Sequence, residues 1–188
     1  MDETSKKILT LTTTHGQIPA VDLGNGETSV NMGQPALEWD KVPLAKNIPT
    51  LELPIEGTPS ATGMGNPHCT FFVEDAEKIN LEEMGPKFEN HPLFPERTNV
   101  QFASITAPDR IRMRVWERGA GITQACGSGA CAAVYAGKLK KLLKLSKKEI
   151  GSSISCSGAC LTLESYNKNL AKFYLSKETL NKTSSRHI

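Results

Sequence analysis

A glycine-rich turn between a predicted strand and a predicted helix carries the residues best suited to chemistry. It runs from Glu117 to Cys131 and contains the sequence Ala-Cys-Gly-Ser-Gly-Ala-Cys. Cys126 stands just before the predicted helix, where unpaired backbone N–H groups and the positive end of the helix dipole stabilise an anion. At such a position the pKa of a thiol falls below its ordinary value of about 8.5. Cys126 is therefore a candidate base or nucleophile.

The neighbours of this cysteine could bind an amino acid. The backbone N–H groups of Gly127 and Ser128 could hold a carboxylate, because glycines let the backbone approach a ligand closely. Glu117 and Arg118 arrive at the end of the preceding strand, and they could bind an ammonium group and a carboxylate respectively. The residues alone leave one alternative open: such a turn needs small residues, and Cys126 is merely one of them.

The other four cysteines are expected to be core residues. Cys131 lies five residues after Cys126 and faces a different part of the predicted helix, and none of Cys69, Cys156 and Cys160 stands at a helix start or in a recognisable basic pocket. A zinc site drawn from Cys126, Cys131, Cys156 and Cys160 would have the spacings C-x4-C and C-x3-C without the flanking residues of a zinc knuckle. We therefore expect no metal site. Neither a phosphate-binding G-x-x-x-x-G-K-[ST] nor a dinucleotide-binding G-x-G-x-x-G motif occurs.

Two further segments hold polar side chains at predicted strand starts. Asn66 precedes Pro67, which favours an extended backbone that could direct the amide into a pocket, and His68 could tune a nearby charge. Asn99 begins another predicted strand, where a turn-forming role is the simpler interpretation. Each segment is a weak signal when taken by itself.

The composition is that of a globular protein of one ordinary domain. The chain has 188 residues, of which 38% are hydrophobic and 22% charged, and its net charge of +2 does not indicate nucleic-acid binding. No stretch approaches the ~20 consecutive apolar residues of a membrane span, and the start of the chain does not have the pattern of a signal peptide. We expect a cytoplasmic protein whose five cysteines are reduced.

Short strands and two helices are expected to position the candidate residues. Alternating apolar residues predict a half-buried strand that ends at Glu117, and apolar residues at helical spacing predict a helix over about 129–145. A second helix is expected near 81–90. Further strands are expected at 8–13, 18–22, 29–32, 70–73, 99–106, 153–163 and 171–175.

Taken together, three segments resemble the C-terminal half of the diaminopimelate epimerase family in order and spacing. They are Met-Gly-Asn-Pro-His-Cys at 64–69, Phe-Pro-Glu-Arg-Thr-Asn-Val at 94–100 and the run from Glu117 to Cys131. The segment Val-Asn-Met-Gly-Gln-Pro at 30–35 also looks like that family. The resemblance covers roughly residues 8–145.

The resemblance implies an α/β (α+β) fold in which a mixed, mostly antiparallel β-sheet wraps around a central helix. It also implies a cofactor-independent amino-acid isomerase that converts LL- to meso-diaminopimelate, a precursor of lysine and peptidoglycan. The family uses two cysteines, one from each of its two halves, as acid and base. Cys126 matches one of them, and His68 matches the residue that tunes the other. Glu117 would modulate the Cys126 thiol.

The resemblance further implies a set of substrate-binding residues for a small-molecule substrate, with no nucleic-acid or membrane partner. They are Asn66, Asn99, Glu117, Arg118, Gly127 and Ser128.

One departure from the family pattern shapes the expected activity. The family's first half has its own Cys-Gly-Asn-Gly motif, and nothing like it precedes Ile8. We therefore expect an N-terminally truncated epimerase that lacks the opposite thiol and is inactive alone. Residues 1–24 would be remnant strands of the first half, 25–175 the epimerase-like domain and 176–188 a polar tail.

Two alternatives remain from the sequence. The chain could be a non-catalytic half-enzyme that binds substrate weakly, or that self-associates, for example as a homodimer, through an exposed apolar face. It could also be another amino-acid isomerase of the same fold, such as a proline-racemase-like enzyme, although the intact run from Glu117 to Cys131 argues against this.

Overall fold

The computed structural model describes six stretches of the chain: 7–13, 16–22, 27–143, 152–156, 159–167 and 170–176, the last three as strand backbone. Two α-helices, α1 (Leu81–Glu89) and α2 (Gly127–Leu139), and one short 3-10 helix, η1 (Ala76–Lys78), lie among the strands. The strands are β1 (Lys7–Thr13), β2 (Gly16–Asp22), β3 (Glu27–Asn31), β4 (Ser60–Gly63), β5 (Pro67–Phe72), β6 (Asn99–Ala107), β7 (Arg110–Glu117), β8 (Gly121–Thr123), β9 (Ser152–Cys156), β10 (Ala159–Asn167) and β11 (Leu170–Ser176).

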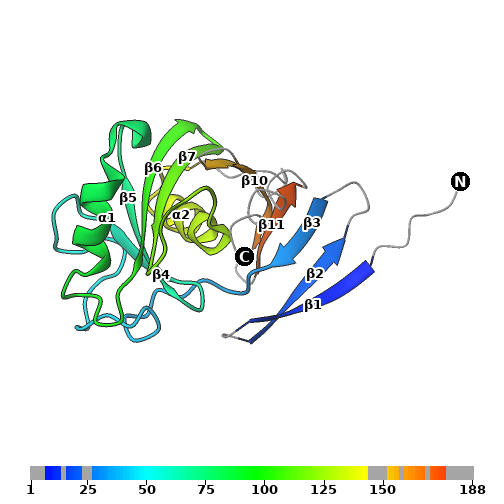
Figure 1. The fold of residues 1–188 in the computed structure, drawn as a ribbon, viewed down its shortest axis with the longest axis horizontal. Coiled ribbons are helices and arrows are strands. Elements are labelled where there is room, and N and C mark those ends of the chain that lie inside the picture. The colour runs from blue at the N-terminus through cyan, green and yellow to red at the C-terminus, as the bar shows by residue number, and fades with distance from the viewer. Residues whose placement is uncertain are drawn as a thin grey trace, which may run out of the picture.

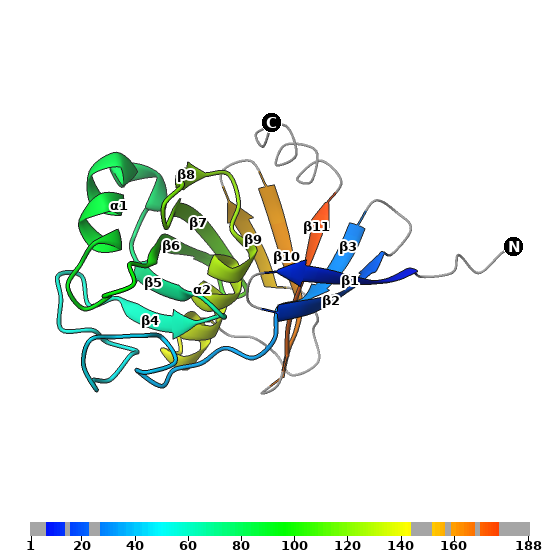
Figure 2. The same cartoon turned by 60° about the horizontal axis from the view of Figure 1, so that its bottom comes forward.

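The strands form one strongly curved sheet. Its order is β1-β2-β3-β11-β10-β9-β7-β6-β5-β4, and the short β8 pairs with β7 beside this path. The pairs β5–β6 and β7–β9 are parallel, and the other strand pairs are antiparallel. The curvature brings the N-terminal strands beside β11, so that segments far apart in sequence become neighbours (Figures 1 and 2).

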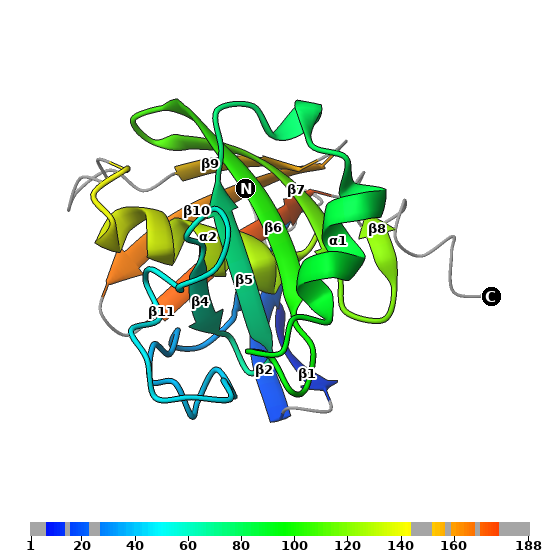
Figure 3. The same ribbon diagram turned by 90° about the vertical axis from the view of Figure 1, so that its left-hand side faces the viewer.

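Helix α2 occupies the inside of this curve. In Figure 3 it passes between β4–β6 on one side and β10–β11 on the other, and it packs against strands on both sides. Its small residues explain this position: nearly every side chain from Gly129 to Gly137 is glycine, alanine, cysteine or valine and is buried, with Tyr135 half-buried. A slim helix lets the sheet approach closely on several sides. The expected sheet around a central helix is confirmed.

The two faces of the β5–β6 pair pack against different helices. Strand alternation places Cys69, Phe71, Val100 and Phe102 on one face, where they form an apolar core with Leu81 and Phe88 of α1. The opposite face lies against α2, and its apolar end joins a second core that contains Ala103, Met113 and the body of α2. The polar residues of this second face gather near the start of α2.

The predicted helix over 129–145 is correct in existence but wrong in both bounds. Helix α2 begins at Gly127 and ends at Leu139. It ends early because Lys141 adopts a left-handed backbone with a φ of 59°, so that Leu142 N donates to Gly137 O and Lys141 N to Lys138 O. These two bonds make a Schellman motif, which closes a helix even when apolar spacing continues beyond it.

The strands differ from the expected ones in three main places, the first being β4 (Ser60–Gly63), which matches none of the expected ranges. The three-residue β8 was not expected, because a strand of that length has no usable alternation. The region after residue 150 holds three strands where two were expected, since Cys156 and Ala159 close a tight antiparallel connection between β9 and β10. The expected polar tail at 176–188 lies outside the described residues apart from Ser176. Within the described ranges no helix is long and apolar enough to cross a membrane.

Candidate active site

The Cys126 turn joins the sheet to α2. Strand β7 ends at Glu117, the chain reverses through β8, and Cys126 then takes the N-cap position of α2 with an extended backbone (φ −135°, ψ 106°). Ala130 N donates to Cys126 O at 2.9 Å, which is the first hydrogen bond of the helix. The N–H groups of Gly127 and Ser128 precede that bond and point along the helix axis toward the N-terminal side. The expected placement of Cys126 at the positive end of a helix is confirmed.

The Cys126 thiol is nearly buried and lies among small groups. The residue is 5% exposed, and its Sγ lies 3.6 Å from Ser128 Oγ. Gly129 leaves room for two groups at once: a Cβ at this position would lie 3.2 Å from Cys126 Sγ and 2.9 Å from Gln101 Nε2. Any other residue at 129 would therefore push the thiol and this amide apart.

Glu117 and Arg118 are held by their neighbours at the end of β7. Glu117 Oε1 accepts a hydrogen bond from Thr123 Oγ1 of the adjacent β8. The backbone N of Arg118 donates to Asn99 Oδ1 at 3.0 Å, and its Nη1 donates to Glu96 O at 3.0 Å. Both side chains are half-buried. Glu117 is thus tied to β8, which leads into the Cys126 turn, whereas the Arg118 guanidinium is held near Glu96 and acts electrostatically on His68.

The side chain of Asn99 ties three parts of the site together. Its Nδ2 donates to Pro67 O at 2.9 Å, while its Oδ1 accepts from Arg118 N. The residue is 4% exposed. Asn99 therefore joins the start of β5 to the end of β7. That Asn99 also contacts a substrate remains a prediction.

His68 is fully buried, and each of its ring nitrogens takes part in one hydrogen bond. Nε2 lies 2.9 Å from Asn66 Oδ1, and Nδ1 lies 2.9 Å from Gln101 Nε2. Burial, together with the positive charge of Arg118, lowers the pKa of His68 to about 3. The imidazole is therefore neutral near pH 7. Its hydrogen-bond partner Asn66 is half-buried and so reaches the protein surface.

The other described cysteines lie in the two cores. Cys69 belongs to the core under α1, and Cys131 to the core around α2. Burial raises the pKa of Cys69, and it raises the pKa of Cys131 to about 12. The prediction that both are core residues is confirmed. The side chains of Cys156 and Cys160 lie outside the described residues, and among the described ones no cluster of three or more metal-ligating side chains occurs.

Two buried residues that shape the site were not predicted from the sequence. Gln101 contacts His68 as described above. Glu89 of α1 accepts hydrogen bonds from Arg97 Nη1 (3.0 Å), Gly119 N (2.9 Å) and Trp116 Nε1 (2.6 Å), and so fixes the turn that follows Glu117. A signal for Gln101 was present, because a polar residue two positions after Asn99 must share its face of the strand.

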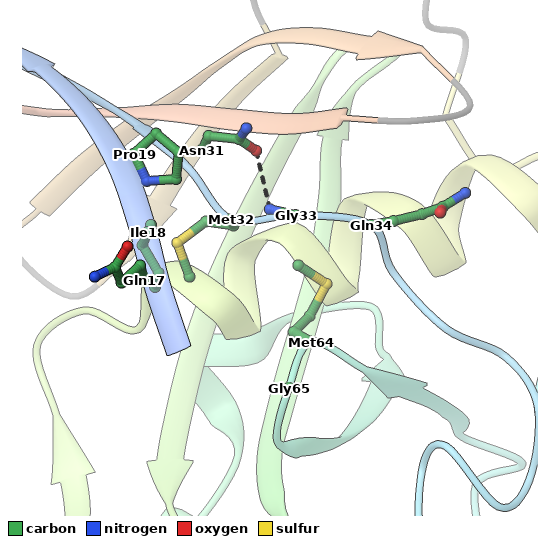
Figure 4. Close-up of a pocket in the computed structure, with 9 residues that line it drawn as sticks. All are labelled: Gln17, Ile18, Pro19, Asn31, Met32, Gly33, Gln34, Met64 and Gly65. Atoms are coloured by element: carbon green, nitrogen blue, oxygen red, sulfur yellow. Dashed lines mark hydrogen bonds between the residues drawn. The ribbon is translucent and has the colours of Figure 1, made fainter. Parts of the chain in front are cut away.

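A cavity of about 270 Å³ is lined in part by Gly65, the residue before Asn66 (Figure 4). Residues of β2 and β3 form one side, and Met64 and Gly65 form another. Asn31 Oδ1 accepts a hydrogen bond from Gly33 N along its edge. None of the lining residues belongs to the Cys126 turn, so the cavity does not contain the thiol. The lining residues are Gln17, Ile18, Pro19, Asn31, Met32, Gly33, Gln34, Met64 and Gly65.

Comparison with known proteins places these residues in a family. The family model of diaminopimelate epimerase matches residues 60–172, which is more than half of the chain and includes every candidate site residue. The chain belongs to the diaminopimelate epimerase family.

Relatives in this family are similar over most of the chain. A diaminopimelate epimerase of Acidiphilium cryptum is 53% identical over 137 residues, covering 70% of this chain and 49% of the relative. One of Rhodospirillum centenum is 46% identical over 139 residues, covering 72% and 48%. The chain thus spans about half the length of the curated relatives it matches.

Solved structures of low sequence identity share the fold. A hydroxyproline epimerase of Agrobacterium vitis, solved with trans-4-hydroxy-L-proline, superposes with a TM-score of 0.60 at 12% identity, over 94% of this chain and 58% of that one. A phenazine biosynthesis protein of Bacillus anthracis gives a TM-score of 0.54 at 14% identity, over 92% and 66%. The expected fold class is confirmed by these likenesses.

Proposed function

We propose that the protein acts as the part of a diaminopimelate epimerase that carries one of two acid–base thiols. The substrate would be 2,6-diaminopimelate, interconverted between its LL and meso forms on the way to lysine and peptidoglycan. The observation that carries this proposal is the position of Cys126 at the N-terminus of α2, within the family match and three residues after Thr123, which holds Glu117.

The proposed reaction is inversion at an α-carbon without a cofactor. The Cys126 thiolate removes the α-proton on one face, the electron pair stays on the α-carbon, and an acid on the opposite face supplies a proton. Run in the other direction, the Cys126 thiol donates the proton. A positive helix end stabilises the thiolate that this requires.

The surrounding groups would hold the reacting end of the substrate. Glu117 would pair with the ammonium group and modulate the thiol, and Arg118 with Asn66 would face carboxylate oxygens. The N–H groups of Gly127 and Ser128 would stabilise the negative charge that develops as the proton leaves. Asn99 would act mainly by holding the backbone of Arg118, which its side chain contacts directly.

The described thiols supply a single reacting group. Cys69 and Cys131 lie in apolar cores, where their raised pKa values keep them protonated near pH 7. We therefore propose that the 188 residues by themselves exchange a proton on one face and do not complete the inversion. A second thiol on the opposite face would be needed for turnover.

Binding and turnover of the purified 188-residue chain test this proposal. Calorimetry with meso-diaminopimelate should show binding, weakened at least tenfold by Arg118→Ala. Arg110→Ala removes an exposed arginine from the other end of β7 and should leave affinity unchanged. Chiral chromatography should show no conversion of the LL form to the meso form. Turnover that is abolished by Cys126→Ala would show that a second acid–base group is present after all.

A second candidate is a half-enzyme that self-associates. One observation favours it: Ile8, Leu9 and Leu11 are exposed on β1, which is an edge strand of the sheet. Exposed apolar edge strands promote association between chains. Analytical ultracentrifugation should then show a dimer that Ile8→Lys converts to a monomer, with calorimetry showing no binding of diaminopimelate.

A further inference from the structure

The side-chain amide of Gln101 lies between His68 and the Cys126 turn. Gln101 is fully buried on β6, on the face that α2 covers. In the parallel pair β5–β6, Asn99 lies beside His68, and Gln101 beside Thr70. The amide therefore contacts both strands of this pair and also lies against Gly129 at the start of α2.

The hydrogen bonds of this amide have a defined direction. Thr70 Oγ1 donates to Gln101 Oε1 at 3.2 Å, so the amide nitrogen is the end that faces His68. An amide NH2 group can only donate, and His68 Nδ1, 2.9 Å away, must therefore accept. A neutral imidazole that accepts at Nδ1 carries its proton on Nε2.

The same direction continues from His68 to Asn66. Nε2–H donates to Asn66 Oδ1 at 2.9 Å, so the oxygen of that amide faces the imidazole and its nitrogen faces away. Within the described part of the chain, Asn66 Nδ2 makes no hydrogen bond. The positive charge of Arg118 acts on the same region, as its effect on His68 shows. An NH2 group near a guanidinium suits a carboxylate oxygen.

We propose that Gln101 is a positioning residue that holds His68 in its Nε2–H tautomer and thereby directs the amide nitrogen of Asn66 toward a carboxylate of the ligand. The opposite tautomer would accept at Nε2 and would turn Asn66 around, so that an oxygen would face the carboxylate and repel it. Thr70 thus donates to Gln101, Gln101 to His68 and His68 to Asn66. This direction determines whether Asn66 presents a donor or an acceptor to the ligand. The ligand part of this inference rests on the proposed function.

Two variants of Gln101 separate the hydrogen bond from packing. In Gln101→Glu the shape is kept, but the carboxylate, when ionised, only accepts, so His68 must then carry a proton on Nδ1. In Gln101→Met the size is similar and the hydrogen bond is absent. Asn47→Asp is the matched control, because it makes the same change of an amide to a carboxylate at an exposed residue outside the Cys126 turn and outside the His68 network.

Long-range 1H–15N NMR spectra of the labelled full chain report the tautomer directly, with His68→Gln used to assign the signal. We expect wild-type His68 to be protonated on Nε2 alone, and Asn47→Asp to be the same. At a pH where its new carboxylate is ionised, Gln101→Glu should show a proton on Nδ1, and Gln101→Met should show a mixture of tautomers. A wild-type proton on Nδ1, or an unchanged tautomer in the folded Gln101→Glu variant at that pH, would overturn the inference. If Gln101→Glu does not fold, the wild-type and Gln101→Met spectra still decide it.

Calorimetry with meso-diaminopimelate tests the link to the ligand separately. Gln101→Glu should bind about tenfold more weakly than wild type, and Asn47→Asp within about twofold of it. An inverted tautomer with unchanged affinity would overturn the role of Asn66 as a donor. Absence of binding in wild type would instead contradict the proposed function, while the NMR result would still decide the tautomer.

Discussion

The two faces of the β5–β6 pair differ in what burial does to their side chains. On the α1 face, Phe71 and Phe102 stack with ring centroids 4.8 Å apart, and Cys69 lies among them. On the α2 face of the same strands, His68 and Gln101 are equally buried but hydrogen-bonded. Neighbouring positions along one strand thus belong to an apolar core and to a polar network.

We infer from this difference that the α1 face contributes mainly to stability, whereas the α2 face carries the groups suited to chemistry. An apolar core tolerates any side chains that fill its volume, whereas a buried polar network holds only if each donor meets an acceptor. Cys69 on the first face is kept protonated by burial. Cys126, at the edge of the second face, lies at a helix N-terminus, where an anion is stabilised. We therefore expect substitutions on the two faces to change different measured quantities.

Loss of an aromatic ring on the α1 face should have the largest effect on stability. Phe102 is 2% exposed, and Phe102→Ala should lower the free energy of unfolding by about 3–5 kcal/mol, measured by urea denaturation. Phe102→Leu should cost less than half as much. At temperatures where the variants are folded, the affinity for meso-diaminopimelate should stay within about twofold. A larger change in affinity would show that the two faces are not separable.

Acid should destabilise the α2 face through His68. Because its pKa is about 3 in the folded chain and about 6.5 when unfolded, the unfolded state binds one more proton between these values. Stability should therefore fall as the pH drops below about 6.5, by up to about 1.4 kcal/mol per pH unit. His68→Gln should remove this component, so the difference between the two pH profiles of urea denaturation isolates it. Parallel profiles would mean that His68 is protonated as readily in the folded chain as in the unfolded chain.

Glu89 links the α1 face to the candidate site, and its replacement should affect both quantities. Glu89→Gln puts an NH2 group among three donors and should lower the free energy of unfolding by about 2 kcal/mol. It should also weaken ligand binding, because the turn that carries Arg118 loses its anchor at Gly119. Glu82→Gln on the exposed face of α1 is the control. If Glu89→Gln binds the ligand with unchanged affinity, Glu89 contributes to stability alone.

The smallest expected effect concerns the core thiols. At pH 8, iodoacetamide should label Cys126 about tenfold faster than Cys69 or Cys131, since only a thiolate reacts and the pKa of Cys131 is about 12. Peptide mass spectrometry after a timed pulse gives the three rates. Addition of urea should abolish the difference, and equal rates in the folded chain would show that these cores open readily.

Most strands and both helices could be predicted from local sequence patterns. Alternation placed the end of β7 at Glu117, because one face of this strand lies on a core, and β6 was expected within one residue of its observed bounds. The end of α2 could not be predicted, since Lys141 takes a left-handed backbone that apolar spacing does not indicate. The paths of β9 to β11 depend on pairing with strands far away in sequence, which local patterns do not encode.

The residues alone predicted the candidate site only where it is continuous in sequence, and the family resemblance was needed to add Asn66, His68 and Asn99. Cys126, Glu117 and Arg118 belong to one turn, and its glycines mark it clearly. Gln101 was missed because its partner His68 is 33 positions away, and Glu89 because it contacts Gly119 from 30 positions away. Such contacts depend on strand register, which sequence reasoning did not determine.

The most direct test of Cys126 as the acid–base group follows the α-hydrogens of meso-diaminopimelate in D2O with the full chain. NMR and mass spectrometry measure deuterium incorporation, and chiral chromatography measures configuration. We predict that deuterium enters with retention of configuration, that Cys126→Ala slows this about 10²–10⁴-fold, and that Cys131→Ala does not. Exchange that persists in Cys126→Ala at the wild-type rate would contradict the assignment of Cys126.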